Sequence, residues 1–315
     1  PSYAGQGVVM TYPLIGNYGV CYDDTESVRP WISAFIVHRL SDFPSNFRCD
    51  IRLDDFLKDN HIPGMEGIDT RALTRVLREK GTMRGMIAYG EDPDREEMKR
   101  KIRSYRIRTP VPEVSCREPA VYGDGPVRVS LLDYGVKNSI LRSLVSRGCT
   151  VKRFPHGADL EELLSFSPDG VMLTNGPGDP KDCIQEIGEL RRLYRKGIPT
   201  FAICLGHQLM ALANGFDTYR LKYGHRGINH PVKEIKSGRV YITSQNHGYV
   251  VDGKTVDPSV ADVSFLSMND GSIEGLNYKN GKTFSVQFHP EASPGPRDTG
   301  FLFDRFLDLM GGDRI

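Results

Sequence analysis

The segment that decides the fold is an apolar strand followed at once by a helix, Phe201-Ala202-Ile203-Cys204-Leu205-Gly206-His207-Gln208. The strand ends at Cys204, and small residues stand two positions before and after it. Small side chains there allow the strand and helix backbones to approach closely at a sharp turn, which lifts the cysteine out of the sheet. The amides at the helix start would stabilise a thiolate. The pattern predicts a nucleophile elbow, although a buried cysteine in an ordinary strand–helix unit is the alternative.

Outward from this turn, apolar strands alternate with amphipathic helices. We expect strands at 127–133, 150–154, 170–174 and 199–203, and helices at 140–145, 160–164, 184–195 and 205–214. This alternation predicts an α/β fold with an open, mainly parallel sheet and helices on both faces. From about Arg239 the pattern changes to short β-rich runs, and a last amphipathic helix carries Phe303 and Phe306.

A segment rich in proline and glycine divides the chain. Between Pro110 and Pro126 there are four prolines and two glycines, with little periodic apolar signal. We therefore predict a mixed, β-rich amino-terminal domain at 1–122 and a second domain at 123–315. In the first domain, Asp69 is a typical N-cap for a helix that ends at Gly81. The chain begins at Pro1 rather than Met, so we expect part of the natural amino terminus to be missing.

Composition excludes several classes of protein. Lys and Arg number 41 against 40 Asp and Glu, so a net charge of +1 offers no basic surface for nucleic acid or for an anionic membrane. No apolar run approaches the roughly 18–20 residues that span a bilayer, and no secretory signal is visible. Six cysteines without a Cys-x-x-Cys pair do not form a disulfide scaffold. We expect a cytoplasmic protein.

Three further segments carry polar groups that could act beside Cys204. His289-Pro290-Glu291 follows an apolar strand and supplies an imidazole base together with a carboxylate that orients it. The loop 174–180, Thr-Asn-Gly-Pro-Gly-Asp-Pro, follows another strand, and its glycines allow the backbone to approach a ligand. The segment 245–249, Gln-Asn-His-Gly-Tyr, has polar groups that could bind an amide or an amino acid. Taken alone, the first two could be ordinary turns, but loops after parallel strands meet at one sheet edge.

No metal or nucleotide site is expected. His-x-Glu also occurs in zinc deaminases, but these need a later Pro-Cys-x-x-Cys, and no cysteine follows Cys204. His225 and His230 are not spaced as in His-Glu-x-x-His. The sequence contains neither a Gly-x-x-x-x-Gly-Lys-Ser/Thr loop nor a Gly-x-Gly-x-x-Gly at a strand–helix junction.

With these four segments in this order, the chain resembles the class I glutamine amidotransferases, whose triad combines an elbow cysteine with a His-x-Glu near the carboxyl terminus. Further segments narrow the resemblance to the small subunits of carbamoyl phosphate synthetase. The segments that carry it are Thr11–Gly19, Gly67–Arg75, Gly224–Pro231 and His289–Pro296. Together with the elbow they extend the resemblance over nearly the whole chain.

The resemblance implies a set of functional residues. Cys204 would be the nucleophile, with His289 and Glu291 completing the triad. Glutamine would be held by Ser2, Gly176, Gly178, Leu205, Gln208, Asn246, Gly248 and Tyr249. The chain departs from the family at Ala202, where many members have glycine, and at Tyr249, where phenylalanine is frequent.

The resemblance also implies the reaction and the partner. Glutamine hydrolysis would release ammonia to the carbamoyl phosphate synthetase large subunit, which makes carbamoyl phosphate for pyrimidine and arginine biosynthesis. No cofactor is expected in this chain, and ATP and magnesium are expected on the large subunit. Two alternatives stay open: a glutaminase of another pathway, such as GMP, anthranilate or CTP synthesis, and a catalytically inactive regulatory subunit.

Overall fold

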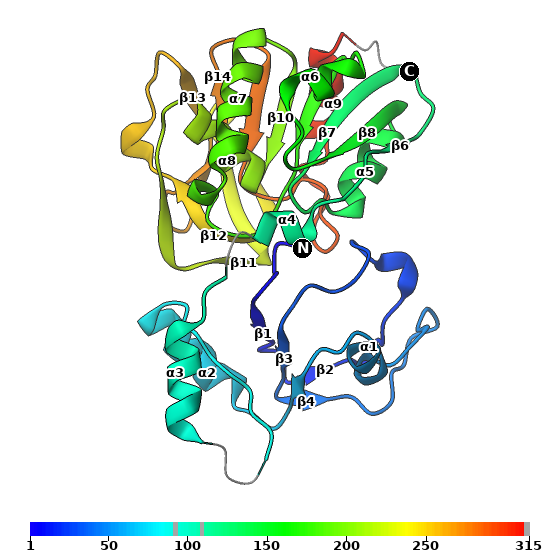
Figure 1. The fold of residues 1–315 in the computed structure, drawn as a ribbon, viewed down its shortest axis with the longest axis vertical. Helices are drawn as coiled ribbons and strands as arrows, with labels where there is room; N and C mark the ends of the chain where they lie inside the picture. Colours follow the sequence, from blue (N-terminus) through cyan, green and yellow to red (C-terminus); the bar gives the residue numbers. More distant parts are fainter. Residues whose placement is uncertain (91–93, 108–109, 312–315) are drawn as a thin grey trace. The chain divides into compact units, whose positions relative to one another are not determined.

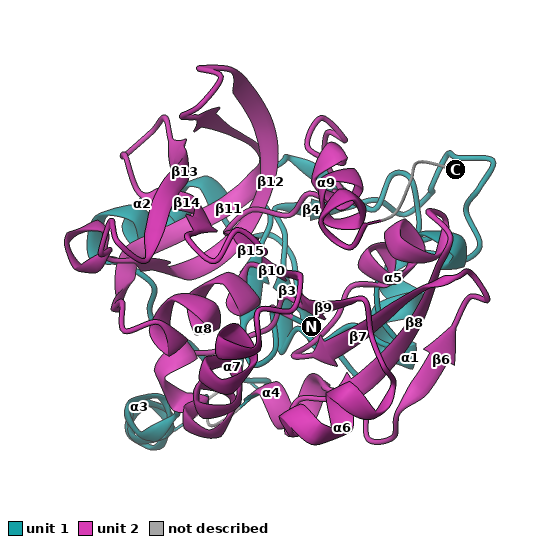
Figure 2. Cartoon of the chain, turned by 90° about the horizontal axis from the view of Figure 1, so that it is seen from above, with its two compact units in different colours: residues 1, 3–110 teal, residues 2, 111–315 magenta. Residues whose placement is uncertain are grey.

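The computed structural model describes residues 1–90, 94–107 and 110–311, which form two compact units. Pro1 and Tyr3–Pro110 belong to the first unit, whereas Ser2 and the residues from Val111 on belong to the second (Figure 2). The division falls before the boundary between residues 122 and 123 that the sequence suggests. The reason is that β6 (Ala120–Tyr122) pairs with β8 (Cys149–Pro155) and so adds a strand to the second unit.

Within the described residues, the first unit contains short strands and three helices. Its parallel sheet has the order β1 (Gly7–Val9), β3 (Ala34–Ile36), β5 (Gly64–Met65), and β2 (Leu14–Ile15) pairs with β4 (Arg39–Leu40). The helices are α1 (Leu53–Asp59), α2 (Thr70–Lys80) and α3 (Arg95–Ser104), and η1 is a 3-10 turn at Tyr22–Asp24. Asp69 caps α2 as predicted, since its Oδ1 accepts a hydrogen bond from the amide of Ala72 at 2.9 Å.

A ten-stranded sheet forms the centre of the second unit (Figure 1). Its middle is parallel, in the order β8, β7 (Val127–Asp133), β9 (Gly170–Leu173), β10 (Thr200–Ile203), β15 (Thr283–Val286). Beyond β15 the strands are antiparallel: β14 (Ile273–Tyr278), β13 (Ala261–Ser267), β11 (Thr218–Glu234) and β12 (Val240–Val251). The parallel part therefore carries the strand–helix alternation of the sequence, and the β-rich carboxyl-terminal part extends the same sheet.

Helices cover both faces of this sheet, as the alternating pattern predicts (Figure 2). On one face lie α6 (Leu160–Ser165), α7 (Ile184–Lys196) and α8 (Leu205–Ala213), and on the other lie α5 (Asn138–Val145) and α9 (Phe301–Leu309). Neighbouring strand residues point to opposite faces: Leu132 packs with the first group and Leu131 with the second. Shorter helical elements are α4 (Pro110–Val114), η2 (Pro180–Asp182) and η3 (Gly253–Thr255). Within the described residues, no helix has the length and apolar character needed to cross a membrane.

Candidate active site

Cys204 occupies the sharp turn between β10 and α8 that the sequence predicts. Its φ of 55° and ψ of −103° lie in a region that residues with a Cβ rarely adopt. Two backbone hydrogen bonds hold the turn: the amide of Cys204 donates to the carbonyl of Val286 at 2.8 Å, and that of Gly206 donates to Thr174 at 3.0 Å. A Cβ on Gly206 would lie 2.7 Å from the carbonyl oxygen of Leu173. The glycine two positions after the cysteine is therefore required for the close approach of strand and helix.

His289 and Glu291 follow β15, the strand that pairs with β10, so they reach the sheet edge where Cys204 lies. Nδ1 of His289 lies 2.6 Å from Oε1 of Glu291. The backbone of His289 is also fixed, because its amide donates to the carbonyl of Ser244 at 2.9 Å. Cys204, His289 and Glu291 are 2%, 4% and 7% exposed, so the sulfur, imidazole and carboxylate act on one another with little competition from water.

A half-buried lysine that was not predicted from the sequence completes this arrangement. Nζ of Lys137 donates to Oε1 of Glu291 at 3.1 Å and also to the carbonyl oxygen of Ala292. Lys137 follows β7, another parallel strand of the same sheet, and its side chain is only 14% exposed. Its position after a parallel strand, at the edge that carries the other loops, is the signal that could have found it.

The charges of this group shift the pKa values of the histidine and the carboxylate apart. Burial opposes protonation of His289, but the Glu291 carboxylate and the hydrogen bond to Cys204 outweigh it and raise the pKa of the imidazole to about 9. Burial likewise opposes ionisation of Glu291, but Lys137 and His289 outweigh it and lower the pKa of the carboxyl to about 2. Both shifts favour an imidazolium beside a carboxylate at neutral pH.

The loop after β9 passes close to the elbow. A Cβ on Gly176 would lie 2.3 Å from the carbonyl oxygen of Tyr134 and 2.7 Å from Cδ2 of Leu205, so only glycine fits there. Gly178 has a φ of 99°, which favours glycine, and it is exposed. Of the predicted glutamine contacts, Gly176 and Leu205 are thus brought together, and Gly178 lies on the exposed part of the loop.

Ser2 lies beside the same loop, within the second unit. Its Oγ accepts a hydrogen bond from Nδ2 of Asn175 at 3.1 Å. Asn175 is fully buried, and its Nδ2 also donates to the carbonyl of Gly135 at 2.8 Å. Asn175, which contacts Ser2, directly precedes Gly176 in the loop. Two of the predicted glutamine contacts, Ser2 and Gly176, are therefore linked through Asn175.

The remaining predicted contacts lie on β12 and at the start of α8. The sulfur of Cys204 is 4.0 Å from the carbonyl oxygen of Asn246. Nε2 of Gln208 donates to the carbonyl of Tyr249 at 2.8 Å and to Oε1 of Gln287 at 2.9 Å, so this amide fastens α8 to β12. Asn246, Gly248 and Tyr249 are half-buried. β12 thus passes the elbow with partly exposed groups, which is what a strand that lines a ligand site requires.

Comparison with known proteins identifies the family of this chain. The class-I glutamine amidotransferase family matches residues 130–309, and the CPSase domain of the carbamoyl-phosphate synthase small chain matches residues 1–87. The carbamoyl phosphate synthase small chain of Listeria monocytogenes serotype 4b (strain F2365) is 50% identical over 99% of this chain and 86% of that protein. The chain belongs to the carbamoyl phosphate synthase small chain family. The small chain of Bacillus thuringiensis subsp. konkukian (strain 97-27) is 48% identical over 98% of this chain and 84% of that protein.

A solved structure supports the fold over part of the chain. A protein assigned as a GMP synthase subunit from Thermoplasma acidophilum aligns with a TM-score of 0.52, at 20% identity, over 59% of this chain and 94% of that protein. At this identity the likeness shows the fold alone. The predicted fold class and the predicted function, the glutamine amidotransferase subunit of carbamoyl phosphate synthase, are confirmed at the level of the family. The roles of individual residues stay predictions.

Proposed function

We propose that Cys204 is the nucleophile of a glutaminase reaction whose ammonia passes to the large subunit of carbamoyl phosphate synthase. The observation that carries this proposal is the strained φ of Cys204, beside a histidine whose Nδ1 is held by a buried carboxylate. Strained backbone at a nucleophile, with a base and an orienting group in line, is the arrangement of thiol and serine acyl-transfer enzymes. The family membership supplies the substrate class, an amide of glutamine.

In the first half of the reaction, the Cys204 thiolate attacks the side-chain amide carbon of glutamine and forms a tetrahedral intermediate. The amide of Leu205, at the start of α8, and the amide of Gly178 would hold its oxyanion. His289 then gives its proton to the leaving nitrogen, and the carbon–nitrogen bond breaks. Ammonia leaves, and a γ-glutamyl thioester remains on Cys204.

In the second half, water hydrolyses the thioester. His289 is now neutral and takes a proton from the attacking water, the carbon–sulfur bond breaks to release the Cys204 thiolate, and the new γ-carboxylic acid gives its remaining proton to solvent as glutamate leaves. The enzyme returns to its thiolate–imidazolium form, so no net proton stays on the site. Glu291 holds the imidazole in one tautomer through both halves, and Lys137 compensates the charge of Glu291.

Recognition of glutamine would use the loop after β9 and the edge of β12. We propose that Ser2, Gly176, Gly178, Leu205, Gln208, Asn246, Gly248 and Tyr249 line the substrate site. Bare glycine backbone allows close approach, and an Asn side chain offers both a donor and an acceptor to the polar ends of an amino acid. ATP and magnesium would act on the large subunit, and the glutamine hydrolysis proposed for this chain uses no cofactor.

The test is a glutaminase assay on the full chain, alone and with the carbamoyl phosphate synthase large subunit. Turnover should be slow alone and faster with the partner, because coupling avoids the release of ammonia that has no acceptor. A glutamine-derived electrophile should label Cys204 in preference to the other five cysteines, as mass spectrometry of the labelled peptide can show. Absence of turnover in both conditions would favour the alternative of a catalytically inactive regulatory subunit. Equal turnover in both conditions would contradict the expected acceleration of glutamine hydrolysis by the large subunit.

A further inference from the structure

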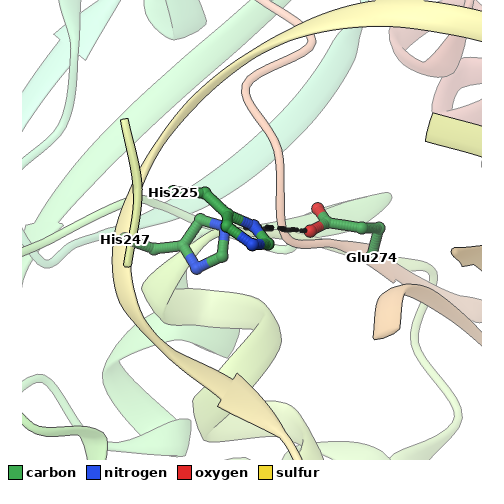
Figure 3. Close-up of side chains that lie close together, drawn as sticks. All are labelled: His225, His247 and Glu274. Atoms are coloured by element: carbon green, nitrogen blue, oxygen red, sulfur yellow. Dashed lines mark ion pairs between the residues drawn. The ribbon is translucent and has the colours of Figure 1, made fainter. Parts of the chain in front are cut away.

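Three buried side chains outside the proposed triad converge in the antiparallel part of the sheet. His225 on β11 is the direct cross-strand partner of His247 on β12, and Glu274 comes from β14. One nitrogen or oxygen atom from each of the three lies within 4.8 Å of the others (Figure 3). The three residues are 6%, 5% and 0% exposed. Buried groups of this kind need a partner, since a buried polar atom without one is costly.

The distances between these atoms suit a small cation. Nδ1 of His225 lies 3.3 Å from Oε1 of Glu274, and Nε2 of His247 lies 3.8 Å from the same oxygen. Nitrogen and oxygen ligands about 2.0–2.2 Å from a tetrahedral metal ion are roughly 3.3–3.6 Å apart. The separations of 3.3 and 3.8 Å between Oε1 of Glu274 and the two histidine nitrogens are close to this spacing.

The far side of each group is held by a residue that fixes its orientation. Nε2 of His225 lies 2.8 Å from Oδ2 of Asp270, and Nδ1 of His247 lies 3.0 Å from the carbonyl oxygen of Tyr249. Oε2 of Glu274 accepts a hydrogen bond from Nε2 of Gln245 at 3.1 Å. Metal-binding histidines typically donate their other ring N–H to a carboxylate or a backbone carbonyl in this way.

These outer contacts determine which atoms have lone pairs directed at the space between the three side chains. A backbone carbonyl can only accept, so Nδ1 of His247 carries the hydrogen and its Nε2 presents a lone pair. That lone pair faces two more acceptors, Oε1 of Gln245 at 3.2 Å and Oε1 of Glu274 at 3.8 Å. Nδ1 of His225 and Oε1 of Glu274 lie 3.3 Å from each other, and neither atom has a further hydrogen-bond partner within the part of the chain that the structure describes.

We infer that His225, His247 and Glu274 bind a divalent transition cation of the zinc class. A proton on His225 could bridge Asp270 and Glu274, but it would leave the lone pair of His247 facing oxygen atoms. A cation satisfies all three atoms at once. Two imidazoles and one carboxylate suit Zn²⁺ or Co²⁺ rather than Mg²⁺, and three protein ligands leave one position for water.

This inference goes beyond the proposed glutamine chemistry and does not depend on it. The cation would join β11, β12 and β14, and β12 carries Asn246 and Gly248 on either side of His247. We therefore expect the cation to hold these three strands together beside the proposed glutamine contacts. Histidine spacing along the chain gives no sign of this site, because its ligands come from three separate strands.

The test uses the full chain carrying Cys204→Ser, so that the elbow cysteine does not bind added metal. After removal of metal with a chelator, Co²⁺ is titrated by calorimetry and by visible absorption, and thermal unfolding is followed with Zn²⁺ or Mg²⁺. We expect one equivalent of Co²⁺ with a ligand-field band and no thiolate charge-transfer band. Zn²⁺, but not Mg²⁺, should raise the melting temperature.

Variants separate this site from adventitious binding. Glu274→Gln should abolish the ligand-field band, and Asp270→Asn should weaken Co²⁺ binding by about 10–100-fold through the orientation of His225. His38→Ala, which removes an exposed histidine of the first unit, is the control and should change neither the ligand-field band nor the affinity for Co²⁺. If Glu274→Gln does not fold, Asp270→Asn carries the comparison. Absence of the band in the parent chain, or a band that both variants retain in full, overturns the inference.

Discussion

Nδ1 of His289 lies 2.6 Å from Oε1 of Glu291, with a single proline between the two residues. A proline fixes its own φ, so the imidazole and the carboxylate are held in one relative arrangement by the backbone. With Nδ1 engaged by Glu291, His289 can exchange a proton with a substrate only through Nε2. The pair therefore determines which ring nitrogen acts as acid and base.

Replacing the elbow cysteine tests the nucleophile. Cys204→Ser should lower glutamine turnover by about three orders of magnitude or more, because a hydroxyl is a far weaker nucleophile at neutral pH. Circular dichroism and glutamine binding should be retained. Cys183→Ser is the matched control: it replaces a buried cysteine at the N-cap of α7, a position where serine is favourable, and should keep turnover. Retention of more than about a tenth of turnover in Cys204→Ser would exclude the assignment.

The pH dependence of stability tests the charge state of the triad. The folded-state pKa of His289, about 9, exceeds its ordinary value of 6.5, so its stabilising contribution is complete below pH 6.5 and is lost as pH rises through 9. The difference in free energy of unfolding between wild type and His289→Gln should therefore shrink from pH 6.5 to above 9. Chemical denaturation at several pH values measures it. A difference that grows with pH would contradict the imidazolium.

The carboxylate of Glu291 should give a pH dependence of stability of the opposite sign, at acidic pH. The pKa of Glu291 is lowered from 4.5 to about 2, so its contribution is present above pH 4.5 and is lost as pH falls toward 2. Wild type should lose its advantage over Glu291→Gln over this acidic range. The comparison is valid only where both proteins are still folded, which near-ultraviolet circular dichroism can establish. A constant difference across the range would mean that Glu291 is not ionised in the folded protein.

Removing the half-buried Lys137 tests how the charge of Glu291 is compensated. Lys137→Met leaves an unbranched side chain of similar length and removes the ammonium that lies 3.1 Å from Oε1 of Glu291. We expect a loss of about 1–3 kcal/mol of stability, because a buried charged acceptor loses a donor. Lys181→Met is the matched control, since Lys181 pairs with Asp217 at 2.6 Å on a surface where its side chain is 49% exposed. That change should cost less than about 1 kcal/mol. Equal losses in the two variants would contradict the role of Lys137.

The fold of the second unit could be predicted well from sequence, and physics explains why. Buried parallel strands and the helices between them give strong apolar patterns: the helix expected at 184–195 is α7, at 184–196. The antiparallel part of the sheet is harder to predict from sequence. Its strand β11 is long and has breaks in register, and its polar and apolar residues do not alternate cleanly. The pattern predicted short β-rich runs only from Arg239, whereas β11 begins at Thr218.

The candidate site could be predicted where its residues lie in short contiguous motifs. Cys204 and His289-Pro290-Glu291 are recognisable because the turn and the paired side chains are local in sequence. Lys137 and the group His225, His247 and Glu274 are not, since their meeting depends on which strands pair and in which register. Pairing between distant strands is not encoded in any one window of the sequence.

A pair of glycine substitutions tests the packing of the elbow. Gly206→Ala adds a Cβ that would lie 2.7 Å from the carbonyl oxygen of Leu173, so strand and helix must separate. We expect a loss of about 1–3 kcal/mol in stability, as overpacking in a core costs, and a fall in turnover as Cys204 moves. Gly188→Ala is the matched control in α7, where a Cβ meets nothing within 4 Å. It should stabilise the protein by about 0.5–1 kcal/mol. Unchanged turnover in a folded Gly206→Ala protein would contradict a tight elbow.

Ser2 gives the sharpest test of the glutamine site, because its role comes from family resemblance and its contact from the structure. Its Oγ accepts from Nδ2 of Asn175, the buried residue that precedes Gly176. Ser2→Ala should weaken glutamine binding by about 0.5–1.5 kcal/mol, a few-fold to roughly tenfold in affinity, and raise KM more than it lowers kcat. Calorimetry on the Cys204→Ser background measures the affinity without turnover.

Ser146→Ala, at an exposed hydroxyl after α5, is the control and should leave affinity unchanged. If Ser2→Ala also leaves it unchanged, the hydroxyl serves only to hold Asn175, and glutamine is bound by the remaining residues of the second unit.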